Sequence, residues 1–318
     1  MIQVIAAPFD GGGAKHGTCL GPTSIRLAGL ESALAQTGNP VAAWHDLENS
    51  PCDEMENGLR NFECFFKLNQ QLHDKTYQAL ENGDFPICLG GEHSISMGSI
   101  SAALASQPEE SLAVIWIDAH PDLNQPATSR TGNLHGMPLA LLGGLPSGVG
   151  GIAREQWSRL EKSLVPRYQL KFKNVAWIGL RDVDSAEADV INRSTGSLPI
   201  TMHDIDVYGI AVELEKLEVW LKAQKIKRVW ISFDVDVLDP LLAPGTGTAV
   251  RGGLTYREAH LIAELFWKMF AKEGCPFKFV GLDVVETNPL EDVSNTTAKM
   301  AVEWIASLFG KTILGRQN

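Results

Sequence analysis

Acidic and imidazole side chains alternate directly after a strongly apolar run of the chain. Asp118, His120 and Asp122 follow the run LAVIWI within the segment DAHPDLN. In an extended chain alternate residues point to the same side, so Asp118 and His120 are expected to face one place. A second pair with the same spacing, Asp234 and Asp236, follows the run RVWISF. The pattern predicts two pairs of chemically active side chains at the ends of two buried strands.

Other apolar runs also end in polar residues. Glu92 and His93 follow FPICLGG, Asp182 and Asp184 follow NVAWIGL, and Glu286 follows FKFVGLDVV. Ligands of open α/β sheets collect beyond the carboxyl ends of the strands, so these groups are expected to meet. Carboxylates gathered in this way repel one another unless a cation lies between them. The predicted metal ligands are His93, Asp118, His120, Asp122, Asp234 and Asp236.

This donor set predicts a centre for two ions. Carboxylate with some imidazole and no thiolate suits Mn²⁺ or a similarly hard divalent ion. The number of donors suffices for two ions if Asp118 and Asp234 each bridge them, and such a pair can activate a shared water near neutral pH. A lone DxD is more often a loop feature or a helix cap, and a lone histidine is usually a satisfied polar residue. The repetition after several strands favours the metal site over these simpler interpretations.

The rest of the chain narrows the chemistry. No GxSxG elbow and no cysteine in an activating motif occurs, which disfavours covalent catalysis. Phosphoryl substrates would need arginine and lysine around them, whereas these strand ends carry mostly acids. The sequence therefore favours metal-assisted hydrolysis of a cationic substrate.

Seven apolar runs alternate with longer segments of helical periodicity. Runs of this kind are typical of strands covered on both faces, so we expect an α/β protein, a three-layer α/β/α sandwich around a central, mostly parallel sheet. Helices are predicted over 21–36, 61–82, 254–270 and 297–309. No repeat or long linker divides the chain, so residues 1–318 are expected to form a single catalytic domain. The apolar runs are IQVIAAP, VAAWHD, FPICLGG, LAVIWIDAH, NVAWIGL, RVWISFDVD and FKFVGLDVV.

Composition excludes several other classes. The net charge of −11 is spread over 318 residues, which argues against a nucleic-acid partner. The start MIQVIAAP lacks the features of a secretion signal, and no apolar run is long enough to cross a bilayer. Five widely spaced cysteines without a CxxC pair suggest reduced thiols. A cytoplasmic protein without membrane attachment is expected.

Three segments resemble the signature motifs of the ureohydrolases, the family of binuclear manganese enzymes that includes arginase and agmatinase. They are GGEHS at 90–94, DAHPDLN at 118–124 and SFDVDVLDP at 232–240, and the similarity extends from APFDGGG near the start to GLDVVETNP near the end. The resemblance implies a central eight-stranded sheet and two Mn²⁺ per subunit. It implies one ion held by His93, Asp118, Asp122 and Asp234, and the other by His120, Asp118, Asp234 and Asp236.

The same resemblance implies roles for further residues. A hydroxide that bridges the ions would attack the guanidinium carbon, with His135, Glu286 and Asp122 as the catalytic residues. Glu286 would pair with the guanidinium, His135 would move a proton or place the substrate, and Thr248 would line the pocket. The family also suggests a homo-oligomer, a trimer or a hexamer.

The far end of the substrate separates members of the family, and here the chain resembles arginase most. The positions that would hold the carboxylate and the amino group of L-arginine are Asn124, Thr131, Asn133, Asp184 and Glu187. Hydrolysis of L-arginine to L-ornithine and urea is therefore the expected activity. Agmatine, guanidinobutyrate, another guanidino acid or formiminoglutamate remain alternative substrates, and a metal protein without turnover or a single-metal deacetylase are alternatives of other classes.

Three features depart from the family pattern. The segment LAPGTGT resembles the agmatinase and formiminoglutamase branch as much as arginase. Glu92 stands where most members have aspartate before the ligand histidine, which predicts a longer or differently aimed contact beside the metal site. Arg130 adds a cation next to Thr131 that could help to hold the carboxylate, although a solvated loop charge is its simplest interpretation.

Overall fold

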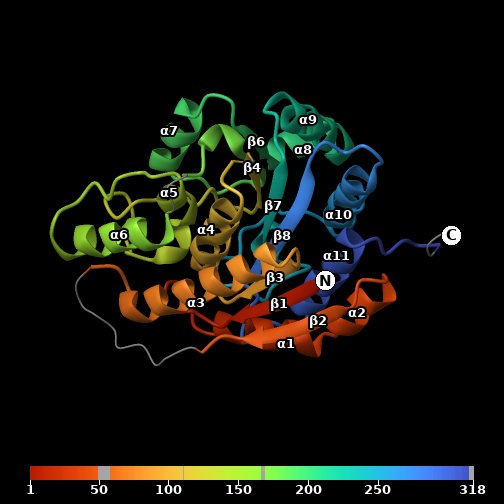
Figure 1. The fold of residues 1–318 in the computed structure, drawn as a ribbon, viewed down its shortest axis with the longest axis horizontal. Helices are drawn as coiled ribbons and strands as arrows, with labels where there is room; N and C mark the ends of the chain where they lie inside the picture. The colour runs from red at the N-terminus through yellow and green to blue at the C-terminus, as the bar shows by residue number, and fades with distance from the viewer. Residues whose placement is uncertain (49–57, 110, 166–168, 315–318) are drawn as a thin grey trace.

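Eight short parallel strands form one continuous sheet at the centre of the molecule (Figure 1). The computed structural model describes residues 1–48, 58–109, 111–165 and 169–314. The strand order is β2-β1-β3-β8-β7-β4-β5-β6, and every neighbouring pair is parallel. The strands are β1 Ile2–Ala7, β2 Val41–Asp46, β3 Phe85–Gly90, β4 Leu112–Ile117, β5 Val175–Leu180, β6 Leu198–Thr201, β7 Arg228–Asp234 and β8 Lys278–Val285.

Both faces of the central strands are buried, which explains their almost unbroken apolar sequences. Ile115 and Ile117 of β4 belong to the core on one face, and Val114 and Trp116 belong to the core on the other. Full burial of such side chains contributes about 1.5–3 kcal/mol each. The central strands are therefore rigid supports for whatever follows their carboxyl ends.

The helices cover the sheet in two layers (Figure 1). The core that contains Ile115 includes residues of α1, α2, α8, α9, α10 and α11, and the core that contains Trp116 includes residues of α3, α4, α5 and α6. The helices are α1 Gly21–Leu27, α2 Leu30–Gln36, α3 Phe62–Glu81, α4 Ser96–Ser106, α5 Pro138–Leu142, α6 Gly151–Leu164, α7 Ser185–Arg193, α8 Met202–Tyr208, α9 Ile210–Ala223, α10 Tyr256–Ala271 and α11 Thr296–Leu308.

The structure confirms the predicted three-layer α/β architecture with its central eight-stranded parallel sheet. Two local predictions were incomplete. The helix expected over 21–36 is divided into α1 and α2 because Gly29 between them takes a left-handed conformation with φ of 93°. Strand β6 was not among the seven predicted runs, since its four residues LPIT include a proline and are too few to show a period.

Two further findings concern membranes and thiols. In the part of the chain that the structure describes, every helix is too short or too polar to traverse a lipid bilayer. Cys19, Cys88 and Cys275 are free thiols, and Cys52 lies outside the described residues.

Candidate active site

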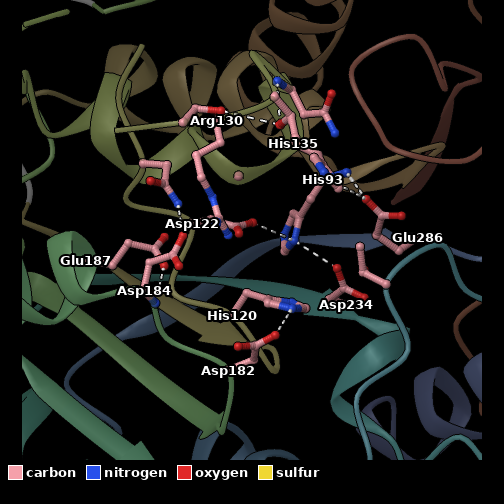
Figure 2. Close-up of a pocket in the computed structure, with 16 residues that line it drawn as sticks. His93, His120, Asp122, Arg130, His135, Asp182, Asp184, Glu187, Asp234 and Glu286 are labelled. Atoms are coloured by element: carbon pink, nitrogen blue, oxygen red, sulfur yellow. Dashed lines mark hydrogen bonds and ion pairs between the residues drawn. The ribbon is translucent and has the colours of Figure 1, made fainter. Parts of the chain in front are cut away.

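Five adjacent strands bring the predicted site residues to one edge of the sheet. The strands β3, β8, β7, β4 and β5 lie side by side, and the acidic and imidazole side chains follow their carboxyl ends. These side chains surround a cavity of about 320 Å³, and Figure 2 shows them converging from several loops. The lining residues are His93, His120, Asp122, Asn124, Ser129, Arg130, Thr131, Asn133, His135, Gly136, Asp182, Asp184, Glu187, Asp234, Thr248 and Glu286.

The two remaining predicted residues, Asp118 and Asp236, lie in contact with these lining residues and are completely buried. Each DxH or DxD pair is joined by a tight turn. Asp118 accepts a hydrogen bond from the backbone N–H of His120 at 2.7 Å, and Asp234 accepts one from Asp236 at the same distance. The side chains of Asp118 and His120 lie together, 3.4 Å apart, whereas Asp234 and Asp236 belong to different groups of potential ligands. In both pairs a side-chain-capped turn, and not the alternation of an extended strand, sets the geometry.

Two groups of potential metal ligands share Asp118. In the first, Nδ1 of His93 lies 2.9 Å from Oδ2 of Asp118 and 3.1 Å from Oδ2 of Asp234. In the second, Nδ1 of His120 lies 3.1 Å from Oδ2 of Asp236 and 3.4 Å from Oδ1 of Asp118. A carboxylate common to two adjacent groups is the arrangement that a binuclear centre requires. The clustered groups could therefore hold two metal ions.

The first group contains two buried polar atoms that make no hydrogen bond. Nδ1 of His93 and Oδ2 of Asp118 are both without a hydrogen-bond partner despite their separation of 2.9 Å. The other ring nitrogen of His93 contacts the hydroxyl of Ser232 at 2.9 Å, and the ring stacks on Trp116 at 3.9 Å. Buried polar atoms almost always have partners, so these two atoms fit a cation-binding role.

The electrostatics of the buried carboxylates also favour a bound cation. Burial raises the pKa of Asp122 and of Asp234 well above the usual carboxyl value, and neighbouring carboxylates raise both further. Burial lowers the pKa of His93, but Asp118, Asp122 and Glu286 outweigh it and raise the value to about 9. An excess of negative charge is thus concentrated in a volume of low dielectric. A bound cation would relieve it.

A third group consists of Glu92, His135 and Glu286. Oε1 of Glu286 accepts a hydrogen bond from the backbone N–H of His93 at 3.0 Å and lies 3.2 Å from Nδ1 of His135. Glu92 accepts hydrogen bonds from the backbone N–H and the hydroxyl of Ser94, and burial raises its pKa to about 7. The unusual Glu92 thus caps the turn that carries His93, and its carboxylate also lies near that of Glu286.

Two of the predicted residues have strained backbones. Asp122 and Glu286 adopt positive φ angles of 52° and 63°, which residues other than glycine rarely adopt. Such strain costs about 1–3 kcal/mol and tends to occur at functional sites. The segment before His93 is also closely packed. A Cβ on Gly91 would lie 1.7 Å from the carbonyl oxygen of Phe9, so only glycine fits at this position.

Polar groups at the far side of the cavity are linked to one another. Nδ2 of Asn124 donates to Asp184 at 3.2 Å, and the backbone N–H of Asn133 donates to Thr131 at 3.3 Å. Both oxygens of Glu187 accept backbone hydrogen bonds, from Leu123 at 2.9 Å and from Asp184 at 3.1 Å. These contacts order the loop after β4 and the start of α7.

Thr248 donates to Oδ2 of Asp236 at 2.8 Å, so its hydroxyl supports one of the buried carboxylates. Ser129, Arg130, Gly136 and Asp182 also line the cavity but were not predicted as site residues. Asp182 follows the same apolar run as the predicted Asp184, so the sequence could have indicated it. Ser129 lies in a polar loop without a distinguishing pattern. Arg60 is a further addition, since it contacts Asn133 from a distant part of the sequence.

The fold and this site are those of a ureohydrolase, with clustered histidine and aspartate groups that could hold a binuclear metal centre. The Arginase family model matches residues 1–310, and the chain belongs to the arginase family. The arginase of Staphylococcus aureus strain MRSA252 is 39% identical, with 98% of each chain covered. Among solved structures, the arginase of Bacillus caldovelox is 34% identical with a TM-score of 0.84, covering 98% of this chain and 99% of that one.

A more distant structure is also similar over its whole length. The arginase of Entamoeba histolytica in complex with L-ornithine is 27% identical with a TM-score of 0.82, and 98% of each chain is covered.

Proposed function

We propose that the protein is a manganese-dependent arginase that hydrolyses L-arginine to L-ornithine and urea. The observation that carries this proposal is that the two ends of the cavity carry different polar groups. Two carboxylate and imidazole groups that share Asp118 lie at its base, and neutral amides and hydroxyls with Arg130 lie at its far side. A substrate with a guanidinium at one end and an amino-acid group at the other matches both.

The described residues fit two Mn²⁺ ions. We assign His93, Asp118, Asp122 and Asp234 to one ion and His120, Asp118, Asp234 and Asp236 to the other. The hard, oxygen-rich donor set and the hydrogen-bond-free Nδ1 of His93 support this assignment. When bound, the two ions supply Lewis acidity and a water of lowered pKa as the nucleophile.

The chain itself positions the guanidinium and moves protons. Glu286 offers a carboxylate that can pair with the guanidinium through two hydrogen bonds. His135 lies beside Glu286, and although burial lowers its pKa, Glu286 outweighs this effect and raises it, so the imidazolium can donate a proton to the departing amine. Oδ2 of Asp122 lies 3.3 Å from Nδ1 of His93, where its carboxylate would accept a hydrogen bond from the nucleophilic water once the ions are bound.

The far side of the cavity recognises the amino-acid group. Asn124, Thr131 and Asn133 donate hydrogen bonds to the carboxylate, and Asp184 attracts the α-ammonium. Glu187 holds Asp184 and Leu123 in place through its own hydrogen bonds. Thr248 keeps Asp236 oriented.

Urea release from a panel of substrates tests the proposal. The protein loaded with Mn²⁺ is incubated with L-arginine, agmatine, guanidinobutyrate and another guanidino acid, and with formiminoglutamate assayed by its own product. L-Arginine is expected to be hydrolysed with the highest kcat/KM. A preference for any other member of the panel would assign the protein to that substrate, and inactivity on all of them would leave a metal protein without turnover.

We further propose that residues 1–318 act as one catalytic domain in the cytoplasm and assemble as a trimer or a hexamer. The free thiols of Cys19, Cys88 and Cys275 are consistent with a reducing compartment. Sedimentation velocity of the purified protein measures the assembly, and a monomer would contradict it.

A further inference from the structure

Arg60 approaches the far side of the cavity from the segment before α3. We propose that Arg60 is a positioning residue for substrate specificity: it orients the side-chain amide of Asn133 so that the N–H₂ group faces the carboxylate of an amino-acid substrate. This inference rests on the proposed function, because only a substrate with a carboxylate at that end would benefit from the arrangement.

The backbone on both sides of Arg60 is anchored. The N–H of Leu59 donates to Oε1 of Gln156 at 2.7 Å, and the Leu59 side chain is buried. Nδ2 of Asn61 donates to the carbonyl oxygen of Gly11 at 2.9 Å. The two anchors fix the point from which the arginine side chain extends, so the contact of Arg60 with Asn133 does not depend on a free loop.

Chemistry determines which way the amide of Asn133 faces. Nη1 of Arg60 donates to Oδ1 of Asn133 at 3.1 Å. A guanidinium has only donors, so it can hold the oxygen of the amide but not the nitrogen. Asn133 is 5% exposed, and its backbone N–H is held by Thr131. The N–H₂ group is therefore the polar group that this buried side chain has left to offer to the cavity it lines.

The contact of Arg60 with Asn133 helps a cavity lined mostly by acids to bind a carboxylate. The cavity is lined by Asp122, Asp182, Asp184, Glu187, Asp234 and Glu286. These acids attract a guanidinium but repel a carboxylate. Arg130 already lines the cavity, and a second cation there would attract the carboxylate at the expense of the guanidinium. Arg60 is not among the lining residues; it holds Oδ1 of Asn133, so that a neutral amide rather than a second arginine is offered to the carboxylate.

Substitution of Arg60 gives a direct test by steady-state kinetics. Arg60→Met removes the donors at similar length and should raise the KM for L-arginine about 10-fold, the loss expected for one oriented hydrogen bond to a charged group. The kcat should stay within about 2-fold, and kcat/KM for agmatine, which has no carboxylate, should not change. Arg60→Lys, which keeps a donor, should restore most of the KM. Arg193→Met on the exposed face of α7 is the matched control.

A second pair of variants tests whether Arg60 acts through Asn133. In the Asn133→Ala background, Arg60→Met should cause no further rise in KM, because the amide that it orients is absent. An unchanged KM in Arg60→Met, no recovery in Arg60→Lys, or an equal rise in the Asn133→Ala background would overturn the inference. A wild-type enzyme that fails to hydrolyse L-arginine would overturn the proposed function itself, so the two failures are distinguishable.

Discussion

Replacing Asp118 by asparagine should dissociate the metal centre while leaving the fold intact. Asp118 belongs to both ligand groups, and its Oδ2 makes no hydrogen bond. Asparagine keeps an oxygen that can accept the N–H of His120 but lacks the negative charge. At about 4 Å and an effective dielectric constant of about 20, one unit charge pair contributes about 4 kcal/mol. That energy corresponds to a dissociation constant about 10³-fold higher.

The assay is metal content after equilibrium dialysis against micromolar Mn²⁺, measured by mass spectrometry. The wild type should retain two ions per chain, and Asp118→Asn should retain one or none. Asp189→Asn, on the exposed surface of α7, is the matched control and should retain two. Circular dichroism of each protein checks that the fold persists. Two ions bound to Asp118→Asn with wild-type affinity would refute the assignment of Asp118 as the shared ligand.

Three further outcomes are expected. Glu286→Gln should lower kcat/KM for L-arginine about 100-fold, as expected for two lost charge-assisted hydrogen bonds, with metal content unchanged; a fall below about 3-fold would remove its guanidinium role. Mn²⁺ at 100 times its dissociation constant should raise the free energy of unfolding by about 2.7 kcal/mol, and denaturation that is insensitive to the metal would exclude a folded-state site. Burial raises the pKa of Asp283 to about 6, so its charged form destabilises the folded state increasingly as pH rises from about 4 to 6. Asp283→Asn should therefore stabilise the metal-free protein by about 3 kcal/mol at pH 7.5 but not at pH 4. Equal effects at both pH values would contradict this.

The sequence was most informative where hydrophobic pattern and motif coincide. The apolar run before Asp118 predicted a buried strand, and the polar residues after it predicted a site, because parallel strands end at one edge of a sheet. The structure adds the strand order, which places five of these ends side by side. It also adds the positive φ angles of Asp122 and Glu286, which depend on tertiary packing and leave no local signal.

Other features could not be predicted from sequence patterns, for physical reasons. The short strand β6 carries too few residues to show a period. The contact of Arg60 with Asn133 joins residues that are 73 positions apart, and neither lies in a recognisable motif with the other. Glu92 could be identified as unusual, but its position as a cap for the turn at His93 required coordinates.

Direct competition between substrates tests the central claim most sharply. The Mn²⁺-loaded wild type is given equal concentrations of L-arginine and agmatine, and L-ornithine and putrescine are quantified early in the reaction, so that their ratio equals the ratio of the two kcat/KM values. The proposed arginase should form L-ornithine in at least about 100-fold excess, as expected when buried polar groups are left unpaired by the substrate that lacks the carboxylate. Equal amounts of the two products, or an excess of putrescine, would contradict the account.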